Sequence, residues 1–156
     1  MQPPSPSPGS RAAGIAAGWL LAGLLPAGFA EVRAAPANWR FDPVHSQVWF
    51  EADHQGFSRA LGRLRIKDGW FRFDPDDWSS AAVDVTLDLA GADLGDAKWN
   101  EAIRSAPWLD VGRHPVARYA SRSVEARDAR SGVIHGELTL RGVVRPVDVE
   151  FTLNRI

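Results

Sequence analysis

The chain has 156 residues, which is the length of one domain plus a targeting segment. Its 18 basic and 19 acidic residues give a net charge of −1 with no basic run, which argues against nucleic acid and an anionic membrane surface as partners. The sequence contains no cysteine, which excludes disulfides, thiolate metal sites and covalently attached haem.

The first thirty residues have the pattern of a secretory signal peptide, which we expect to be helical. Arg11 is followed by the uncharged apolar run 12–30, and small residues then provide cleavage positions after Ala30 or after Ala37. Cleavage after Ala30 is preferred because the helix breaker Pro26 lies just upstream. A retained membrane anchor is the alternative, but the Ala/Gly content of the run argues against it. We therefore expect an exported protein whose mature part carries 17 basic and 19 acidic residues.

The mature chain, from about residue 38 to residue 156, has the pattern of a series of short β-strands. Lys67-Asp68-Gly69 predicts one hairpin turn and Arg141-Gly142 predicts another. The alternation of apolar and polar residues is clearest over 81–89. Strands are predicted near 45–53, 59–66, 69–74, 81–89, 116–125, 132–141 and 144–153.

One segment breaks this pattern with helical spacing. Residues 96–106 place Trp99, Ala102 and Ile103 on one side of a helix, with Asp96 as N-cap and Pro107 as its stop. The whole predicts an all-β, antiparallel domain, a barrel or a sandwich, with one short helix. An eight-stranded barrel has either a filled interior or room for one small ligand.

No constellation of residues points to catalysis or to a metal. The histidines His45, His54, His114 and His135 lack metal-ligand spacing. There is no nucleophile elbow, and the same-face pair Asp84 and Asp88 is explained by the solvated side of a strand. We therefore predict a non-enzymatic protein without a cofactor.

Apolar residues at inward-facing positions either fill an ordinary core or line a hollow that takes a long apolar ligand. Periodicity alone does not decide between these two interpretations. These positions are Val48, Phe50, Phe71, Phe73, Val83, Val85, Leu87, Leu89, Tyr119, Leu138, Leu140, Val149 and Phe151.

Four groups of residues occur in a fixed order along the mature chain: Asp42-Pro43-Val44-His45-Ser46 with Val48 and Phe50; Gly62 with Phe71 and Phe73-Asp74-Pro75; Ile103-Arg104-Ser105 with Trp108-Leu109-Asp110-Val111 and His114-Pro115; and Gly136 to Val147. No single group is specific, but their order and spacing together are. From about Trp39 to Phe151 the chain resembles the YceI-like family of periplasmic lipid-binding proteins.

The resemblance implies a lipocalin-like antiparallel β-barrel whose cavity holds a polyisoprenoid, such as a quinone or a prenyl phosphate. The inward-facing residues above then become the cavity lining, together with Trp99 and Trp108. His54 and Asn100 are the predicted polar groups at its mouth. On this basis we predict a periplasmic carrier or binding protein for an isoprenoid lipid.

Three departures from the family pattern bear on this prediction. Trp99-Asn100-Glu101 stands where the family helix carries other polar residues, and Val144 replaces a threonine. Family members generally continue for a few dozen residues beyond the position of Ile156. A barrel without those strands would have a free edge. A second copy completing the sheet as a homodimer, closure with fewer strands, or a truncated sequence are the open alternatives.

A rival function is a non-catalytic interaction module that partners a membrane redox protein. It expects a packed core and an exposed aromatic patch near Trp70, Trp78 or Trp99. The sequence does not identify the ligand, its head group or the oligomeric state.

Overall fold

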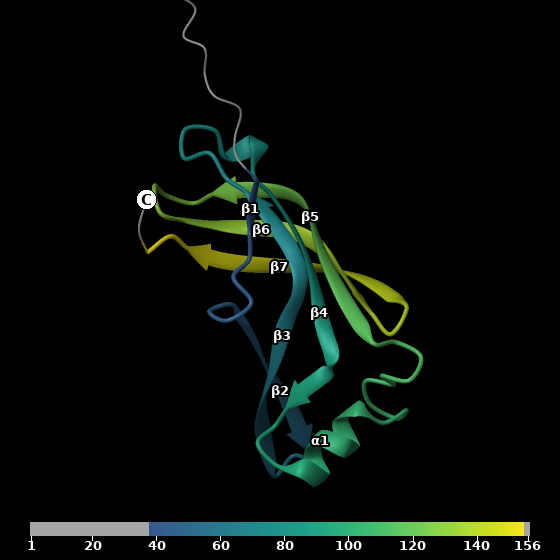
Figure 1. The fold of residues 1–156 in the computed structure, drawn as a ribbon. Helices are drawn as coiled ribbons and strands as arrows, with labels where there is room; N and C mark the ends of the chain where they lie inside the picture. The colour runs from purple at the N-terminus through teal and green to yellow at the C-terminus, as the bar shows by residue number, and fades with distance from the viewer. Residues whose placement is uncertain (1–37, 155–156) are drawn as a thin grey trace, which may run out of the picture. The chain divides into compact units, whose positions relative to one another are not determined.

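The computed structural model describes residues 38–154, and the predicted signal peptide at residues 1–30 lies outside them. These residues form one antiparallel sheet with one α-helix at its end (Figure 1). The elements are β1 (Asn38–Arg40), β2 (Gln47–His54), β3 (Ser58–Arg72), the 3-10 helix η1 (Trp78–Ser80), β4 (Ala82–Asp93), α1 (Ala97–Arg104), β5 (Val116–Ala126), β6 (Ser131–Leu140) and β7 (Val143–Thr152). Neither helix in residues 38–154 is long and apolar enough to cross a membrane.

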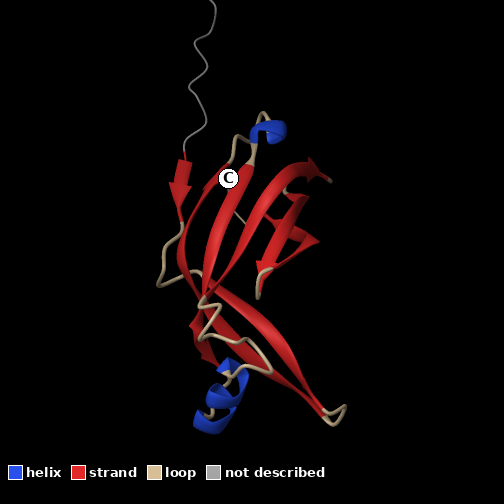
Figure 2. Ribbon diagram, turned by 90° about the vertical axis from the view of Figure 1, so that its right-hand side faces the viewer, coloured by secondary structure: helices blue, strands red, loops and turns tan. Residues whose placement is uncertain are grey.

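The sheet has the strand order β1-β3-β4-β5-β6-β7, and β2 also pairs with β3. Because β4 occupies one edge of β3, the short strands β1 and β2 share its other edge. The sheet is strongly curved, as Figure 2 shows, and every pairing in it is antiparallel. The predicted all-β antiparallel fold with one short helix is confirmed. Within residues 38–154 the sheet is open, since β7 pairs only with β6.

The predicted hairpin at Lys67-Asp68-Gly69 is wrong. β3 runs without a turn through these residues, with a register shift against β4 between Ile66 and Asp68. Gly69 is needed there for close approach, because a Cβ atom on it would lie 2.7 Å from the carbonyl oxygen of Asp84. A glycine after an aspartate is favoured in a turn and also at a bulge within a strand, so Asp68-Gly69 does not by itself distinguish the two.

Two other local predictions are confirmed. Arg141 and Gly142 have φ values of 53° and 75°, the left-handed pair that a two-residue hairpin between β6 and β7 requires. The Asp96 carboxylate caps α1 by accepting hydrogen bonds from the N–H groups of Lys98 and Trp99. The helix ends at Arg104, before the predicted stop at Pro107.

The two faces of the curved sheet differ in chemistry. The outer face carries ion pairs between neighbouring strands, such as Asp84 with Arg118 and Arg122 with Glu137. The inner face is apolar, and toward its α1 end it is closed by a packed core. The buried members of this core are Leu64, Val85, Leu87, Leu89, Ala92, Ile103, Ala117 and Tyr119. Three of these residues, Val85, Leu87 and Tyr119, also border the unfilled part of the inner face.

Candidate binding site

A cavity of about 560 Å³ lies on the inner face of the sheet, and we call it the groove. Strands from β2 to β7 all contribute to it, because the curvature brings their inward-facing side chains around one space. It is lined by Phe41, His45, Ser46, Gln47, Val48, Ile66, Val83, Val85, Leu87, Tyr119, Ile134, Leu138, Val147 and Val149. Its volume is in the range of pockets that hold small-molecule ligands.

An apolar hollow of about 260 Å³ adjoins the groove. The two share Phe41, Val83 and Ile134 as lining residues, so apolar surface continues from one into the other. Aromatic contacts build this end: the Trp78 ring stacks on Phe151 at 5.7 Å and meets the edge of Phe73 at 5.0 Å. A long apolar molecule therefore has an extended surface available.

The polar lining residues of the groove are consecutive in the chain. His45, Ser46 and Gln47 lie at the start of β2. The Nδ1 atom of His45 lies 2.8 Å from the carboxylate of Asp42. This hydrogen bond, followed by one from the N–H of Val44, lowers the pKa of Asp42 below its ordinary value. The groove thus has one polar end on an otherwise apolar surface.

Tyr119 adds one hydroxyl to the apolar wall. Its oxygen lies 3.0 Å from the carbonyl oxygens of Ile134 and Val147, to which the hydroxyl proton is donated. Burial raises the pKa of the Tyr119 phenol, and the negative charge of Asp148 adds to the shift. The Tyr119 hydroxyl is therefore hydrogen-bonded within the sheet, and Tyr119 presents its ring to the groove.

The structure distributes the predicted lining residues over four places. Val48, Val83, Val85, Leu87, Tyr119, Leu138 and Val149 line the groove, and Phe71, Phe73 and Phe151 join Val83 around the adjoining hollow. Phe50 and Leu140 pack against the core, and Leu89 is 1% exposed inside it. Trp99 and Trp108 line a separate cavity beside α1, described below.

Several groove residues escaped the sequence analysis. Ile66 stood next to the wrongly predicted turn, and Ile134 is separated from Leu138 by Gly136 in the alternation. His45 is not among the predicted lining residues. Strand alternation could have identified two of them. Ile66 is two residues from Leu64 and Ile134 is four residues from Leu138, so each faces the same side of the sheet as that leucine.

The predicted polar mouth is not at the groove. His54 lines the cavity beside α1, a space of about 170 Å³ that shares no lining residue with the groove. Asn100 has an internal role: its Oδ1 accepts from the N–H of Leu94 at 2.6 Å, and its Nδ2 donates to Asp93 at 2.9 Å. Asn100 therefore ties α1 to the end of β4.

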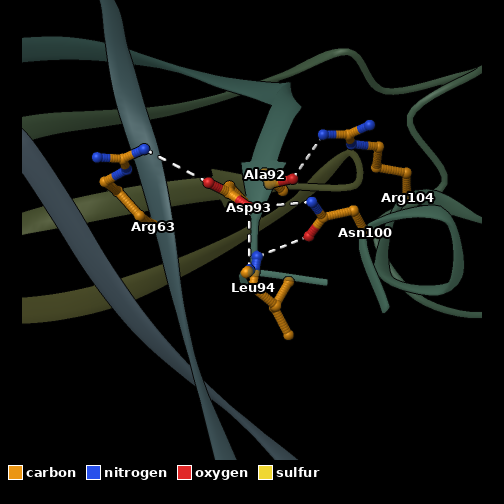
Figure 3. Close-up of polar contacts among 7 residues, drawn as sticks. Arg63, Ala92, Asp93, Leu94, Asn100 and Arg104 are labelled. Carbon is orange, nitrogen blue, oxygen red and sulfur yellow. Dashed lines mark hydrogen bonds and ion pairs between the residues drawn. The ribbon is translucent and has the colours of Figure 1, made fainter. Parts of the chain in front are cut away.

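Figure 3 shows that this tie belongs to a larger polar cluster. Arg63 on β3 donates to the other carboxylate oxygen of Asp93, and Arg104 on α1 donates to the carbonyl of Ala92 at 2.7 Å. The Asn100 bond, and next the N–H of Gly95, lower the pKa of Asp93. The cluster is structural, since its bonds join β3, β4 and α1. Among residues 38–154, no group of three or more His, Asp or Glu side chains is arranged to hold a metal ion.

A family model for the YceI-like domain matches residues 39–156. The chain belongs to the YceI-like family. Its curated relatives include a UPF0312 protein of Ectopseudomonas mendocina, 38% identical over 117 residues that cover 74% of this chain and 61% of the relative. Protein YceI of Escherichia coli O157:H7 is 33% identical over 127 residues, covering 80% and 66%. This YceI-like chain thus spans less than two thirds of the length of these relatives.

Solved structures show the same fold. The crystal structure of BcnA from Burkholderia cenocepacia has a TM-score of 0.60 at 24% identity, covering 70% of this chain and 67% of that one. The Campylobacter jejuni YceI protein has a TM-score of 0.54 at 22% identity, covering 70% and 64%. At these identities the YceI-like chain shares the fold with both.

Proposed function

We propose that this YceI-like protein is a periplasmic, non-catalytic carrier that binds an isoprenoid lipid in the groove. The observation that carries the proposal is the groove itself. It is an apolar space of about 560 Å³ with the polar residues His45, Ser46 and Gln47 at one end. The family resemblance supplies the ligand class, and the signal-peptide pattern of residues 1–30 supplies the compartment.

The groove can hold such a ligand by apolar contact alone. Each buried methylene contributes about 0.8 kcal/mol, so two isoprene units contribute roughly 8 kcal/mol before the cost of ordering the ligand. Val149 is 38% exposed while it lines the groove, so a ligand there would also cover apolar surface now in contact with water. The polar end at the start of β2 would receive the quinone or phosphate head group.

The rival function, an interaction module for a membrane redox protein, expects a filled interior. The groove is instead hollow along six strands, which supports the carrier. The tryptophans of the expected patch also lie apart: Trp78 packs with Phe73 and Phe151, whereas Trp99 lines the cavity beside α1.

Native mass spectrometry of the protein, purified from the periplasm of its own organism, tests the proposal. We expect a bound species with the mass of an isoprenoid lipid, or uptake of added ubiquinone or undecaprenyl phosphate. Val149→Asp should abolish uptake because it places a carboxylate in the groove. Val144→Asp is the matched control, since Val144 is on the same strand, is 54% exposed and faces outward. Equal uptake by both variants would show that the lipid binds elsewhere.

A further inference from the structure

The cavity beside α1 is a second, independent feature, and we call it the helix pocket. It is lined by Ala52, Asp53, His54, Ala60, Leu94, Trp99, Ala102, Ile103 and Trp108. We propose that the helix pocket binds a small organic cation that carries a methylated ammonium group, through the rings of its two tryptophans.

Small side chains create this space. Ala52 and Ala60 are directly paired across β2 and β3, and Ala102 on α1 faces the same cavity. In Figure 1, α1 lies at the same end of the sheet as the hairpin of β2 and β3. Larger residues at these three positions would fill the gap between helix and sheet. The pocket therefore results from which residues face one another.

The helix pocket is physically separate from the groove. The buried side chains of Leu64, Leu87 and Leu89 belong to the core that packs between α1 and the open part of the inner face. The pocket's volume of about 170 Å³ is below the roughly 300 Å³ of ordinary ligand pockets. It suits a small group and not a lipid chain.

Aromatic rings form the walls of the pocket. Trp99 is 42% exposed and Trp108 is 47% exposed, so neither tryptophan is consumed by core packing. The ring of His54 lies 5.6 Å from that of Trp99, tilted by 38°. The face of a tryptophan attracts a cation electrostatically, and methylated ammonium ions bind best among such rings because they are weakly hydrated.

The residues around the pocket bring no fixed positive charge, since no lysine or arginine lines it. Side chains alternate along β2, so the carboxylate of Asp53 lies on the side away from Ala52 and His54, where Arg59 is its cross-strand partner. The attraction for a cation therefore comes from the tryptophan rings.

The test compares choline with 3,3-dimethylbutan-1-ol, in which a neutral tert-butyl group replaces the trimethylammonium group. Binding to the mature protein is followed by calorimetry and by broadening of the ligand methyl signal in NMR spectra. We expect choline to bind at least about tenfold more tightly, a difference of about 1.4 kcal/mol. Equal affinity for the two compounds, or no binding of choline, would overturn the proposal.

Variants locate the site. Trp99→Leu and Trp108→Leu should each weaken choline binding about threefold or more, because each removes one ring face from the pocket. Trp49→Leu is the control, because Trp49 is 58% exposed on β2 and does not line the pocket. Unchanged choline affinity in folded Trp99→Leu and Trp108→Leu proteins would refute the assignment. Lipid uptake by the groove should be unaffected in both variants, so this result is distinguishable from failure of the carrier proposal.

Discussion

The ring of Phe50 on β2 lies directly against its β3 partner Gly62. A Cβ atom on Gly62 would be 2.3 Å from the Cζ atom of Phe50, so only glycine lets the ring lie flat on the sheet. Phe50 packs on the core at this level, between the positions of Val48 in the groove and Ala52 in the helix pocket. The Phe50–Gly62 pair thus helps to divide the inner face into two cavities.

Gly62→Ala should destabilise the protein because the new methyl group displaces the Phe50 ring. We expect the free energy of unfolding to fall by about 1–3 kcal/mol, measured by urea denaturation. Gly112→Ala is the control, since nothing lies within 4 Å of its would-be methyl group. Equal stability of the two variants would contradict the described packing.

Asn100→Ala should loosen α1 from the end of β4, because it removes the acceptor of the Leu94 N–H and the donor to Asp93. The expected loss is about 1–3 kcal/mol in the free energy of unfolding. Faster amide hydrogen exchange in α1 should accompany it. Glu101→Ala, one exposed position further along α1, should change neither quantity.

Tyr119 is the one tyrosine of the sequence, so its ionisation can be read directly by ultraviolet absorbance. Burial, and next the charge of Asp148, place its pKa above the ordinary 10.0. We expect a titration midpoint above that value in the folded protein, and a further rise when lipid covers the ring. A midpoint at the ordinary value, unchanged by lipid, would argue that the ring does not face a ligand.

His135 should make stability depend on pH. Its hydrogen bond to Asp148 on β7 is the main cause of a raised pKa, and Glu125 on β5 adds to the shift. A raised pKa means that protonation favours the folded state. The stabilisation is therefore fully present below the unfolded pKa of 6.5 and is lost as pH rises through the folded value.

Urea midpoints measured across this window, for wild type and His135→Gln, isolate the histidine. The wild type should lose stability relative to the variant as pH increases. If the difference in urea midpoint between the two proteins stays constant across this pH window, His135 is not protonated beside Asp148 and Glu125.

Local patterns in the sequence were sufficient for much of the fold. The alternation at Val83, Val85 and Leu87 predicts both a strand and its inward face, because side chains alternate across a sheet. The Asp96 cap and the Arg141-Gly142 turn involve bonds and backbone angles of neighbouring residues. The Lys67-Asp68-Gly69 turn failed because pairing of β3 with strands on both edges outweighs a local turn preference.

The sequence by itself therefore determined most of the strands and their inward faces, the helix start and the family; β3 is the exception, since it is one strand where two were predicted. The tertiary structure alone decided where the inward faces enclose space. Which residues oppose one another across strands sets the cavities: Ala52 meets Ala60 and leaves a pocket, whereas Phe50 meets Gly62 and fills the gap. These pairings join parts of the chain that are distant in sequence. Local periodicity therefore does not predict how much space their side chains fill together once the sheet is curved.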